Sequence, residues 1–490
     1  MSGREGVILW LRRDLRLSDH PALCAACAGG GPVIPVFILD PKERGLGGAA
    51  PRWRLSRSLA ALSRDLEQAG SRLILRQGEA LATLEDLLAE TGARKVVWSR
   101  LYDPESIERD TRVKAALRTA DIEAESFGGH LLYEPFAPKT KTGGFFKVYS
   151  PFWRAVSALD PVPESLPRPG RVPAPSDWPR SLRLEDLGLE RAMNRGAAIV
   201  ARHARIGEAA AQETLDAFVD GPIACYADRR DRPDLPGTSG LSAHLAVGEI
   251  SPRTIWRAAE AAAAVDPKAE KGAEVFRKEI VWREFAWHLL YHTPHIAERN
   301  WRPEWDGFPW REDNEDAERW RRGRTGEPFV DAAMRELYVT GVMHNRARML
   351  TASYLTKHLM TDWRVGEAWF RDCLVDWDPA SNAMGWQWTA GSGPDAAPYF
   401  RIYNPQTQAE KFDPAGDYVA RWLPEVSRRD LAREPHPDGL SFFEACPRRW
   451  GLSPDDAYPA PVVSLTAGRA RALDAYTVLK NTEDSKELTS

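Results

Sequence analysis

Five short apolar segments alternate with helical patterns over residues 6–128, and this rhythm constrains the fold more than any other feature of the 490-residue chain. Each segment is apolar with little alternation, as expected of strands that are buried on both faces. The helical patterns between them lie at 20–28, 52–69, 80–91 and 105–119. The rhythm predicts an α/β domain built on a doubly wound, parallel, five-stranded sheet. The expected strands are Val7–Leu11, Val33–Leu39, Arg72–Leu75, Lys95–Ser99 and Ile122–Ser126.

The segment after the first expected strand carries no GxGxxG fingerprint. A basic run, Arg12–Arg16, takes its place, so the sequence does not predict a classical dinucleotide site there. Ligands of doubly wound sheets bind at the carboxyl ends of the strands. We therefore expect any ligand of this domain to lie near Arg12–Arg16, Asp40–Lys42 and Arg100–Glu105.

A proline-rich stretch at 134–190 separates this domain from a second one. It reads as an inter-domain connection that is partly ordered by Tyr149, Phe152 and Trp153. From about 205 to 425 the pattern is helical nearly throughout, with Ser251 and Pro252 starting one helix as N-cap and first residue. Further helices are expected at 272–292, 328–340, 343–360, 364–373 and 415–423.

The predicted organisation therefore has four parts. An α/β domain spans 1–133, a linker 134–200, a large all-helical domain 201–478 and a polar tail 479–490, which we expect to be frayed. No apolar run reaches membrane-spanning length, and the N-terminus lacks the apolar region of a secretory signal. The five cysteines are scattered, which is typical of a reducing compartment and predicts the cytoplasm. Cys24-x-x-Cys27 lies in an Ala-rich helical run, where a buried helix face is expected rather than redox or metal chemistry.

The stretch Cys373–Arg401 concentrates acids, an amide and large aromatics in a chain with 19 tryptophans. Two interpretations are open from these residues alone. The segment is either a Trp-rich helix end packed into a core, or part of a site that holds a planar, polar ligand. The residues concerned are Asp376, Asp378, Asn382, Trp386 and Trp388.

Three other segments have comparable patterns. Thr238–Ser242 places hydroxyls and a glycine ahead of a helix, which suits either a phosphate or an ordinary cap. Glu279 and Trp282 share a helical face, with Arg283 one turn from Glu279, as in a ligand-facing stripe or a salt-bridged surface helix. The segment 343–349 combines an amide, arginines and methionines, which suit a pocket for a mixed polar and apolar ligand.

A metal site is the competing hypothesis. His288, His292 and His295 are spaced like ligands on one helical face, with Glu284 one turn earlier. Pro294 interrupts the helix before His295, and the order does not form HExxH. A metal-dependent hydrolase would also leave the tryptophan content unexplained, so we predict no metal.

Taken together, these stretches resemble the photolyase/cryptochrome family. The resemblance covers nearly the whole chain, with its motifs in the expected order, and is closest to bacterial class III cyclobutane pyrimidine dimer photolyases. The motifs are Trp10–Leu23, Gly237–Arg253, Glu279–Phe285, Met343–Met349, Asp376–Trp388 and Tyr399–Asp413.

The resemblance implies an α/β antenna domain, an all-helical FAD-binding domain and a specific set of FAD contacts. Asn382 matches the residue that faces flavin N5 and favours the reduced, anionic FADH⁻. The other matching FAD positions are Tyr226, Thr238, Ser239, Leu241, Ser242, Arg283, Asn345, Arg348, Asp376 and Asp378.

The resemblance also implies a light-driven repair reaction on UV-damaged DNA. A flipped-out dimer would be clamped by tryptophans and hydrogen-bonded by Glu279 while excited FADH⁻ donates an electron that splits the cyclobutane ring. Trp386, Trp363 and Trp310 match the proximal, middle and outer members of the photoreduction chain. The matching dimer pocket is Glu279, Trp282, Asn345, Met349 and Trp388. Phosphate contacts are expected from Arg230, Arg346 and Arg401, since the net charge of −4 requires a local basic patch.

Several positions set this chain apart from parts of the family. Relatives that repair (6-4) lesions have histidines where this chain has Asn345 and Met349, which argues for cyclobutane dimers. Met384 adds bulk before Trp386, and Trp377 stands between the two FAD-site acids as an additional electron branch. Ser106 replaces a folate-binding Glu of enterobacterial relatives. The class III resemblance still favours methenyltetrahydrofolate as antenna over 8-hydroxy-deazaflavin, with an empty site as a third option.

The alternative function is a cryptochrome-like blue-light receptor that signals through a partner. The dimer pocket and the lack of a long C-terminal extension favour repair instead. The sequence therefore predicts a monomer that needs damaged DNA, no membrane and no protein partner.

Overall fold

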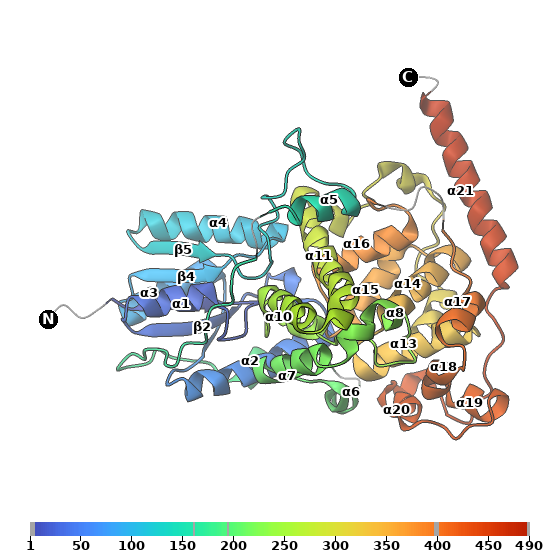
Figure 1. Ribbon diagram of the computed structural model, residues 1–490, viewed down its shortest axis with the longest axis horizontal. Coiled ribbons are helices and arrows are strands. Elements are labelled where there is room, and N and C mark those ends of the chain that lie inside the picture. Colours follow the sequence, from blue (N-terminus) through green and yellow to red (C-terminus); the bar gives the residue numbers. More distant parts are fainter. Residues whose placement is uncertain (1–4, 160–161, 194–195, 396–400, 488–490) are drawn as a thin grey trace.

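The computed structural model describes residues 5–159, 162–193, 196–395 and 401–487. Figure 1 shows two bodies, with the sheet and its helices at the N-terminal end and a larger helical body beyond them. Long linker segments run between the two. The predicted division into an α/β domain and an all-helical domain is confirmed.

The α/β domain is a fully parallel sheet with strand order β3-β2-β1-β4-β5. Three strands match their predicted bounds. β3 lies two residues later than predicted, because Leu73 is buried outside the ladder while the strand continues through polar residues to Gln77. β5 begins one residue later. The strands are β1 (Val7–Leu11), β2 (Val33–Leu39), β3 (Ile74–Gln77), β4 (Lys95–Ser99) and β5 (Glu123–Phe127).

Alternate residues of the central strands pack against different helices. Leu9 and Phe37 face α1 (Pro21–Ala28) and α2 (Ala49–Gln68), whereas Trp10 and Val36 face the opposite pair. Because both faces are covered, the strands read as continuous apolar runs. The opposite pair is α3 (Ala80–Thr91) and α4 (Pro104–Thr119).

The second domain is a bundle of helices, of which α11 makes contacts with several others. The predicted helix 343–360 is divided into α14 and a π-helical turn, Tyr354–His358. Residues 379–390, whose helical extent the sequence left open, form a full helix, α16. The helices are α6 (Ala197–His203), α7 (Glu208–Val219), α8 (Tyr226–Arg229), α9 (Ser242–Val247), α10 (Pro252–Val265), α11 (Glu270–His292), α12 (Glu315–Arg321), α13 (Pro328–Thr340), α14 (Asn345–Ser353), α15 (Trp363–Cys373), α16 (Pro379–Ala390), α17 (Pro405–Phe412), α18 (Asp417–Trp422), α19 (Pro424–Asp430), α20 (Pro437–Ala445) and α21 (Leu465–Glu487).

The linker and the tail behave differently from each other. Within the linker, α5 (Tyr149–Val156) buries Tyr149 and Phe152 against the core that contains α11, which confirms the partial order predicted for it. The tail was expected to be frayed beyond residue 478. Instead α21 continues to Glu487, because Leu479 is buried in a small cluster with Trp305 and Phe308.

Across the described ranges, no helix is long and apolar enough to cross a membrane.

Candidate functional site

Two cavities in the helical domain share one wall. The larger encloses about 1460 Å³, open to solvent, between the segment 238–245, α11, α14 and α16. The smaller, of about 600 Å³, lies between α14, α15 and α16. Six residues line both cavities, so the two spaces adjoin each other. These residues are Asn345, Arg348, Asp376, Asp378, Ser381 and Gly385.

Two aspartates organise the polar wall of this space. Asp378 is the N-cap of α16, accepts from the Ser381 N–H at 2.8 Å, and also accepts from the indole N–H of Trp287 at 3.0 Å. Asp376 accepts from Arg348 at 2.7 Å through one oxygen. The other oxygen, Oδ1, is buried and has no hydrogen-bond partner. A buried acceptor without a partner indicates that a ligand donor belongs beside it.

Two glycines around α16 have opposite surroundings. A Cβ added at Gly385 would meet nothing within 4 Å, so this position leaves the cavity open. A Cβ added at Gly366 would overlap the indole edge of Trp386, so α15 and α16 can cross this closely only with glycine there. The first glycine makes room for a ligand and the second for a buried tryptophan.

Asn382 lines the smaller cavity, and a hydrogen bond to α15 fixes its side chain. Its amide Nδ2 donates to Oε1 of Glu367 on α15 at 2.9 Å. Burial raises the pKa of Glu367, which favours its protonated form. The sequence did not single out Glu367, because nothing in a spacing of 15 residues between two helices marks the pair.

The rim of the larger cavity combines an acid with stacked rings. Glu279 forms an ion pair with Arg230, while burial raises the pKa of its carboxyl and the Arg230 charge opposes that rise. Trp282 stacks on Tyr149 from the linker, with ring centroids 3.6 Å apart and planes 5° from parallel. Tyr149 was predicted only as an ordering residue of the linker. No signal in the sequence connects it with Trp282, 133 positions away.

The expected phosphate-binding arginines lie around the cavity rather than in its lining. Arg346 pairs with Asp231 at 2.9 Å. The Arg401 guanidinium lies 6.0 Å from the Trp388 ring centroid, and neither residue lines the described part of the two cavities. Met349, by contrast, lines the smaller cavity and receives a long contact from Asn345 Nδ2, 3.8 Å from its sulfur.

Buried tryptophans lead away from the smaller cavity. Trp386 lines it and makes edge contacts with Phe370 at 4.9 Å and with Trp320 at 6.2 Å between centroids. Trp363 is fully buried in the same core cluster, and Trp310 packs against that cluster. The sequence noted Trp320 only for its spacing from Trp310, and its contact with Trp386 depends on the fold.

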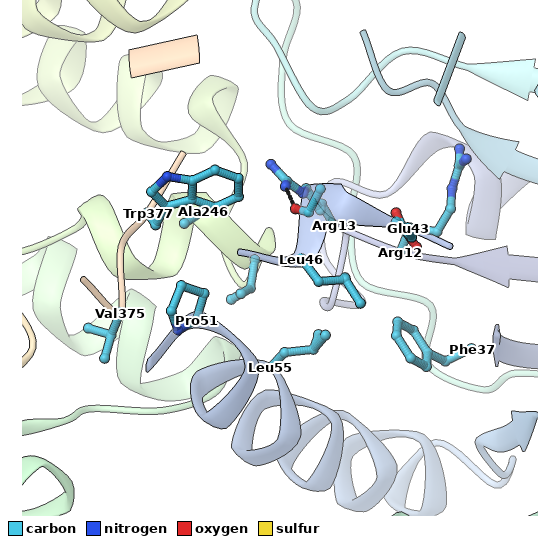
Figure 2. A pocket seen from close by; sticks show the side chains of 12 residues that line it. Arg12, Arg13, Phe37, Glu43, Leu46, Pro51, Leu55, Ala246, Val375 and Trp377 are labelled. Carbon is cyan, nitrogen blue, oxygen red and sulfur yellow. Dashed lines mark hydrogen bonds between the residues drawn. The ribbon is translucent and has the colours of Figure 1, made fainter. Parts of the chain in front are cut away.

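A third cavity, of about 500 Å³, lies between the domains (Figure 2). Arg12 and Arg13 enter it from the end of β1, Leu46 and Leu55 line it beyond the end of β2, and Trp377 closes it from the helical domain. This is the edge of the sheet where the sequence predicted a ligand. Trp377 also lines the smaller cavity of the helical domain, so one side chain separates the two spaces.

Position 106, where some relatives bind folate, has a structural contact here. Ser106 is buried in the first turn of α4, its N–H donates to the cap Asp103 at 3.0 Å, and its hydroxyl accepts from Arg109 at 3.3 Å. Ser106 is not part of the lining of the inter-domain cavity.

The histidines of the competing metal hypothesis hold the linker to α11. His288 Nδ1 donates to the Pro135 carbonyl at 2.7 Å, and its Nε2 accepts from the Phe146 N–H at 3.0 Å. Both ring nitrogens are therefore used, and burial lowers the pKa of His288 to about 4, which keeps it neutral. The described residues contain no cluster of three potential ligands suited to a metal.

The predicted ligand residues from four distant segments line the large cavity together. Tyr226, Thr238, Ser239, Leu241, Ser242, Glu279, Trp282, Arg283, Asn345, Arg348, Asp376 and Asp378 all do so. Met384 lines it as well and packs against the core cluster that includes residues of α11, whereas Trp386 belongs to a different cluster. Tyr399 and Phe400, from the last motif, lie outside the described residues.

A space of this size, with an unpaired acceptor and an open glycine, is typical of a protein that binds a large cofactor with a planar part and a polar part. Comparison with known proteins specifies that class. Residues 7–170 match the family model described as DNA photolyase, and residues 276–478 match the FAD binding domain of DNA photolyase. The chain therefore belongs to the photolyase/cryptochrome family.

Individual relatives cover nearly the whole chain. It is 47% identical over 97% of its length to a protein named deoxyribodipyrimidine photo-lyase from Agrobacterium fabrum, of which 98% is covered. It is 37% identical over 96% of its length to cryptochrome-1 of Arabidopsis thaliana, of which 70% is covered. The crystal structure of a bacterial class III photolyase from Agrobacterium tumefaciens superposes with a TM-score of 0.90 at 47% identity, over 98% of this chain and 99% of that one.

Proposed function

We propose that this protein repairs cyclobutane pyrimidine dimers in DNA by a light-driven reaction that uses FAD. The observation that carries the proposal is that Glu279 and Trp282 line the same cavity as the residues suited to FAD. The carboxyl of Glu279 can hydrogen-bond the edge of a pyrimidine, and the ring of Trp282 can stack on its face. Both would then lie in the same cavity as the cofactor. The names of the relatives in Agrobacterium, Synechococcus and Halobacterium support the same activity.

FAD fits the residues that are present. The unpaired Asp376 oxygen and the Arg348 partner suit polar edges of the cofactor, and Gly385 leaves room for its planar part. Thr238, Ser239 and Ser242 offer hydroxyls for its phosphates and ribose. Once bound in its fully reduced, anionic form, FAD would supply the electron that splits the dimer.

The lesion would enter beside Trp282. The Tyr149 ring fixes the indole plane from one side, so the other face is available for a flipped pyrimidine to stack on. Glu279 can hydrogen-bond a pyrimidine edge, and Asn345 with Met349 makes a neutral, soft wall. Trp388 would complete the clamp, with Arg401 and Arg346 toward the phosphates. The absence of histidine at 345 and 349 favours cyclobutane over (6-4) lesions.

Trp386, Trp363 and Trp310 would return the flavin to its working redox state by relaying electrons from the surface. Support comes from the place of Trp386 in the wall of the smaller cavity and from the shared core that contains the other two. Trp320 lies beside Trp386, with ring centroids 6.2 Å apart, and would offer that relay a second route.

The inter-domain cavity is our candidate for the antenna site. Its arginines suit an anionic tail, and its apolar residues and Trp377 suit a planar chromophore. Methenyltetrahydrofolate is the preferred occupant, with 8-hydroxy-deazaflavin or an empty site as the alternatives. Trp377 would lie between antenna and flavin.

The working form would be a monomer in the cytoplasm that acts on UV-damaged DNA without a protein partner. All five cysteines are free, as a reducing compartment favours.

One experiment separates repair from signalling. The purified protein is reduced, mixed with dimer-containing oligothymidine and illuminated, and dimer loss is measured by absorbance recovery. We expect a flavin spectrum and loss of dimers. A flavin spectrum without dimer loss would favour the receptor, and a colourless protein would reject both.

A single substitution tests the electron relay within the same assay. Trp386→Phe should block photoreduction of oxidised FAD, because the ring expected to be the proximal member of the relay is removed. Repair by chemically reduced enzyme should continue, since the lesion pocket is unchanged. Loss of both activities would reject the role of Trp386.

A further inference from the structure

A basic arm, residues 135–159, contains no acidic residue between Glu134 and Asp160. Acids make up 70 of the 490 residues, about one in seven, so a stretch of this length would ordinarily hold several. The arm carries four cations instead, in a protein whose net charge is −4. They are Lys139, Lys141, Lys147 and Arg154. The arm therefore has a local positive electrostatic potential that would attract an anionic partner.

The lysines of the arm are exposed and have no ion-pair partner among the residues described. Two acids beside its base already have hydrogen-bond or ion-pair partners other than these lysines. Glu134 pairs with Arg100 at 2.7 Å, and Asp395 accepts from the Tyr149 N–H at 3.2 Å. Across the described ranges, no ion pair therefore neutralises the charges of these three lysines.

The arm is built to hold its shape. Its tip is closed by hydrogen bonds from the Thr140 N–H to the Gly144 carbonyl at 2.8 Å and from the Gly143 N–H to the Thr140 carbonyl at 2.9 Å. Its base is tied to α11 by His288, and Phe145 stacks on His292 with centroids 4.9 Å apart and planes 9° from parallel. Figure 1 shows a loop of this segment projecting past α5. Such preorganisation lowers the entropy lost on binding.

The arm adjoins the proposed lesion pocket at Tyr149. Tyr149, within it, stacks on Trp282, and its hydroxyl donates to the Lys278 carbonyl of α11 at 2.7 Å. The expected phosphate contacts of the damaged strand, Arg346 and Arg401, come from α14 and the segment before α17. The arm is thus continuous with the lesion pocket but comes from a different part of the chain.

We propose that the basic arm binds phosphates of the undamaged strand, opposite the flipped dimer. The inference rests on the proposed function. A flipped dinucleotide keeps its own backbone at the pocket rim, whereas Lys139 and Lys141 lie at the hydrogen-bonded tip of the arm. Contacts of this kind strengthen binding to duplex DNA and add nothing for a single strand.

The test compares a triple variant, Lys139→Gln, Lys141→Gln and Lys147→Gln, with the unaltered protein. Dark binding of flavin-loaded protein to a dimer-containing oligonucleotide is measured by fluorescence anisotropy, both as duplex and as single strand, over a salt series. We expect duplex affinity to fall about tenfold. The salt slope should become shallower by about 2 to 3, and single-strand affinity should stay unchanged.

A matched control removes three charges from the α/β domain: Arg94→Gln, Arg112→Gln and Arg118→Gln. It changes the net charge equally but should leave both affinities unaltered. Equal losses on duplex and single strand in the arm variant would overturn the proposal and place the arm on the damaged strand. No loss on either would also overturn it and leave an acidic protein surface as the partner.

The proposed function is assessed separately in the same preparation. Repair under light at saturating single-stranded substrate should be equal in the arm variant and the unaltered protein. If the unaltered protein repairs no dimers, the proposed function fails, whereas the dark measurements still decide whether the arm binds duplex DNA.

Discussion

The cofactor cavity of the helical domain and the cavity between the domains differ in what builds their walls. The first is lined by residues of one domain and organised by partners within it, such as Arg348 with Asp376 and Asp378 with Trp287. The second has walls from both domains and exists only where they dock. Trp377 and Ala246 line part of each, and Trp377 is the larger of the two side chains.

The inter-domain cavity depends on a few docking contacts. The Gly48 N–H donates to the Arg371 carbonyl at 3.0 Å, and the Ala49 N–H donates to Asp372 at 2.9 Å, at the start of α2. From this difference we expect substitutions at the domain junction to have little effect on flavin binding. Antenna binding should be sensitive to them.

The largest effect is expected inside the cofactor cavity. Arg348→Ala leaves the buried Asp376 carboxylate without its cation, which costs about 3 kcal/mol or more. The purified variant should contain little FAD and unfold at lower temperature, as measured by flavin absorbance and thermal denaturation. If FAD content were normal, this ion pair would not organise the cavity. Arg64→Ala, on the exposed side of α2, serves as the arginine control.

A pH effect is expected at the junction between the linker and α11. Glu284 accepts from the Leu132 and Tyr133 N–H groups at 2.8 and 3.2 Å, and burial raises its pKa to about 7. A raised pKa means that the folded state holds the proton more tightly than the unfolded state. The contribution is therefore present below about pH 4.5 and is lost as pH rises through 7, by about 3 kcal/mol.

Denaturant unfolding between pH 5 and 8 checks this contribution. Glu284→Gln keeps the acceptor oxygen but cannot titrate, so its unfolding free energy should fall less steeply than that of the unaltered protein. Glu327 and Glu336 also have a pKa raised to about 7, so the difference between the two proteins carries the result. Parallel pH profiles would show that Glu284 does not titrate in this range.

Substitutions at two glycines distinguish an effect on core packing from an effect on the space for the cofactor. Gly366→Ala should destabilise the protein by about 1–3 kcal/mol, because the new methyl group overlaps Trp386. Gly385→Ala should stabilise the flavin-free protein by about 0.5–1 kcal/mol, since alanine favours a helix and meets no atom. Its methyl group should nevertheless weaken FAD binding. Thermal unfolding with and without FAD measures both, and equal behaviour of the two variants would contradict the assigned roles.

The sequence predicted most of the fold because the decisive signals are local. Apolar runs bounded by turns placed the strands to within two residues, and the Ser251 cap with Pro252 marked the start of α10. The end of the chain was mispredicted because Leu479 and Tyr476 pack against distant residues, and polar composition alone cannot reveal such contacts.

The site residues divide in the same way. Asp376, Asp378 and Asn382 lie in one motif and could be predicted together. Tyr149 and Glu367 could not, because each meets its partner, Trp282 or Asn382, only through the packing of separate helices. The inter-domain cavity was located only as an edge of the sheet, since its far wall comes from the other domain.

The sharpest test of the comparison, with only a small effect on stability, concerns Trp377. Trp377→Phe leaves a modest void beside Gly47 and costs about 1 kcal/mol. We expect antenna chromophore to be lost on purification while FAD stoichiometry stays unchanged, because the smaller ring no longer closes the inter-domain cavity. Absorbance of the antenna and flavin bands in one spectrum measures both. Leu46→Ala, which affects only the inter-domain cavity, should give the same result. Loss of both chromophores from Trp377→Phe would mean that the two cavities form one binding unit, and retention of both would place the antenna elsewhere.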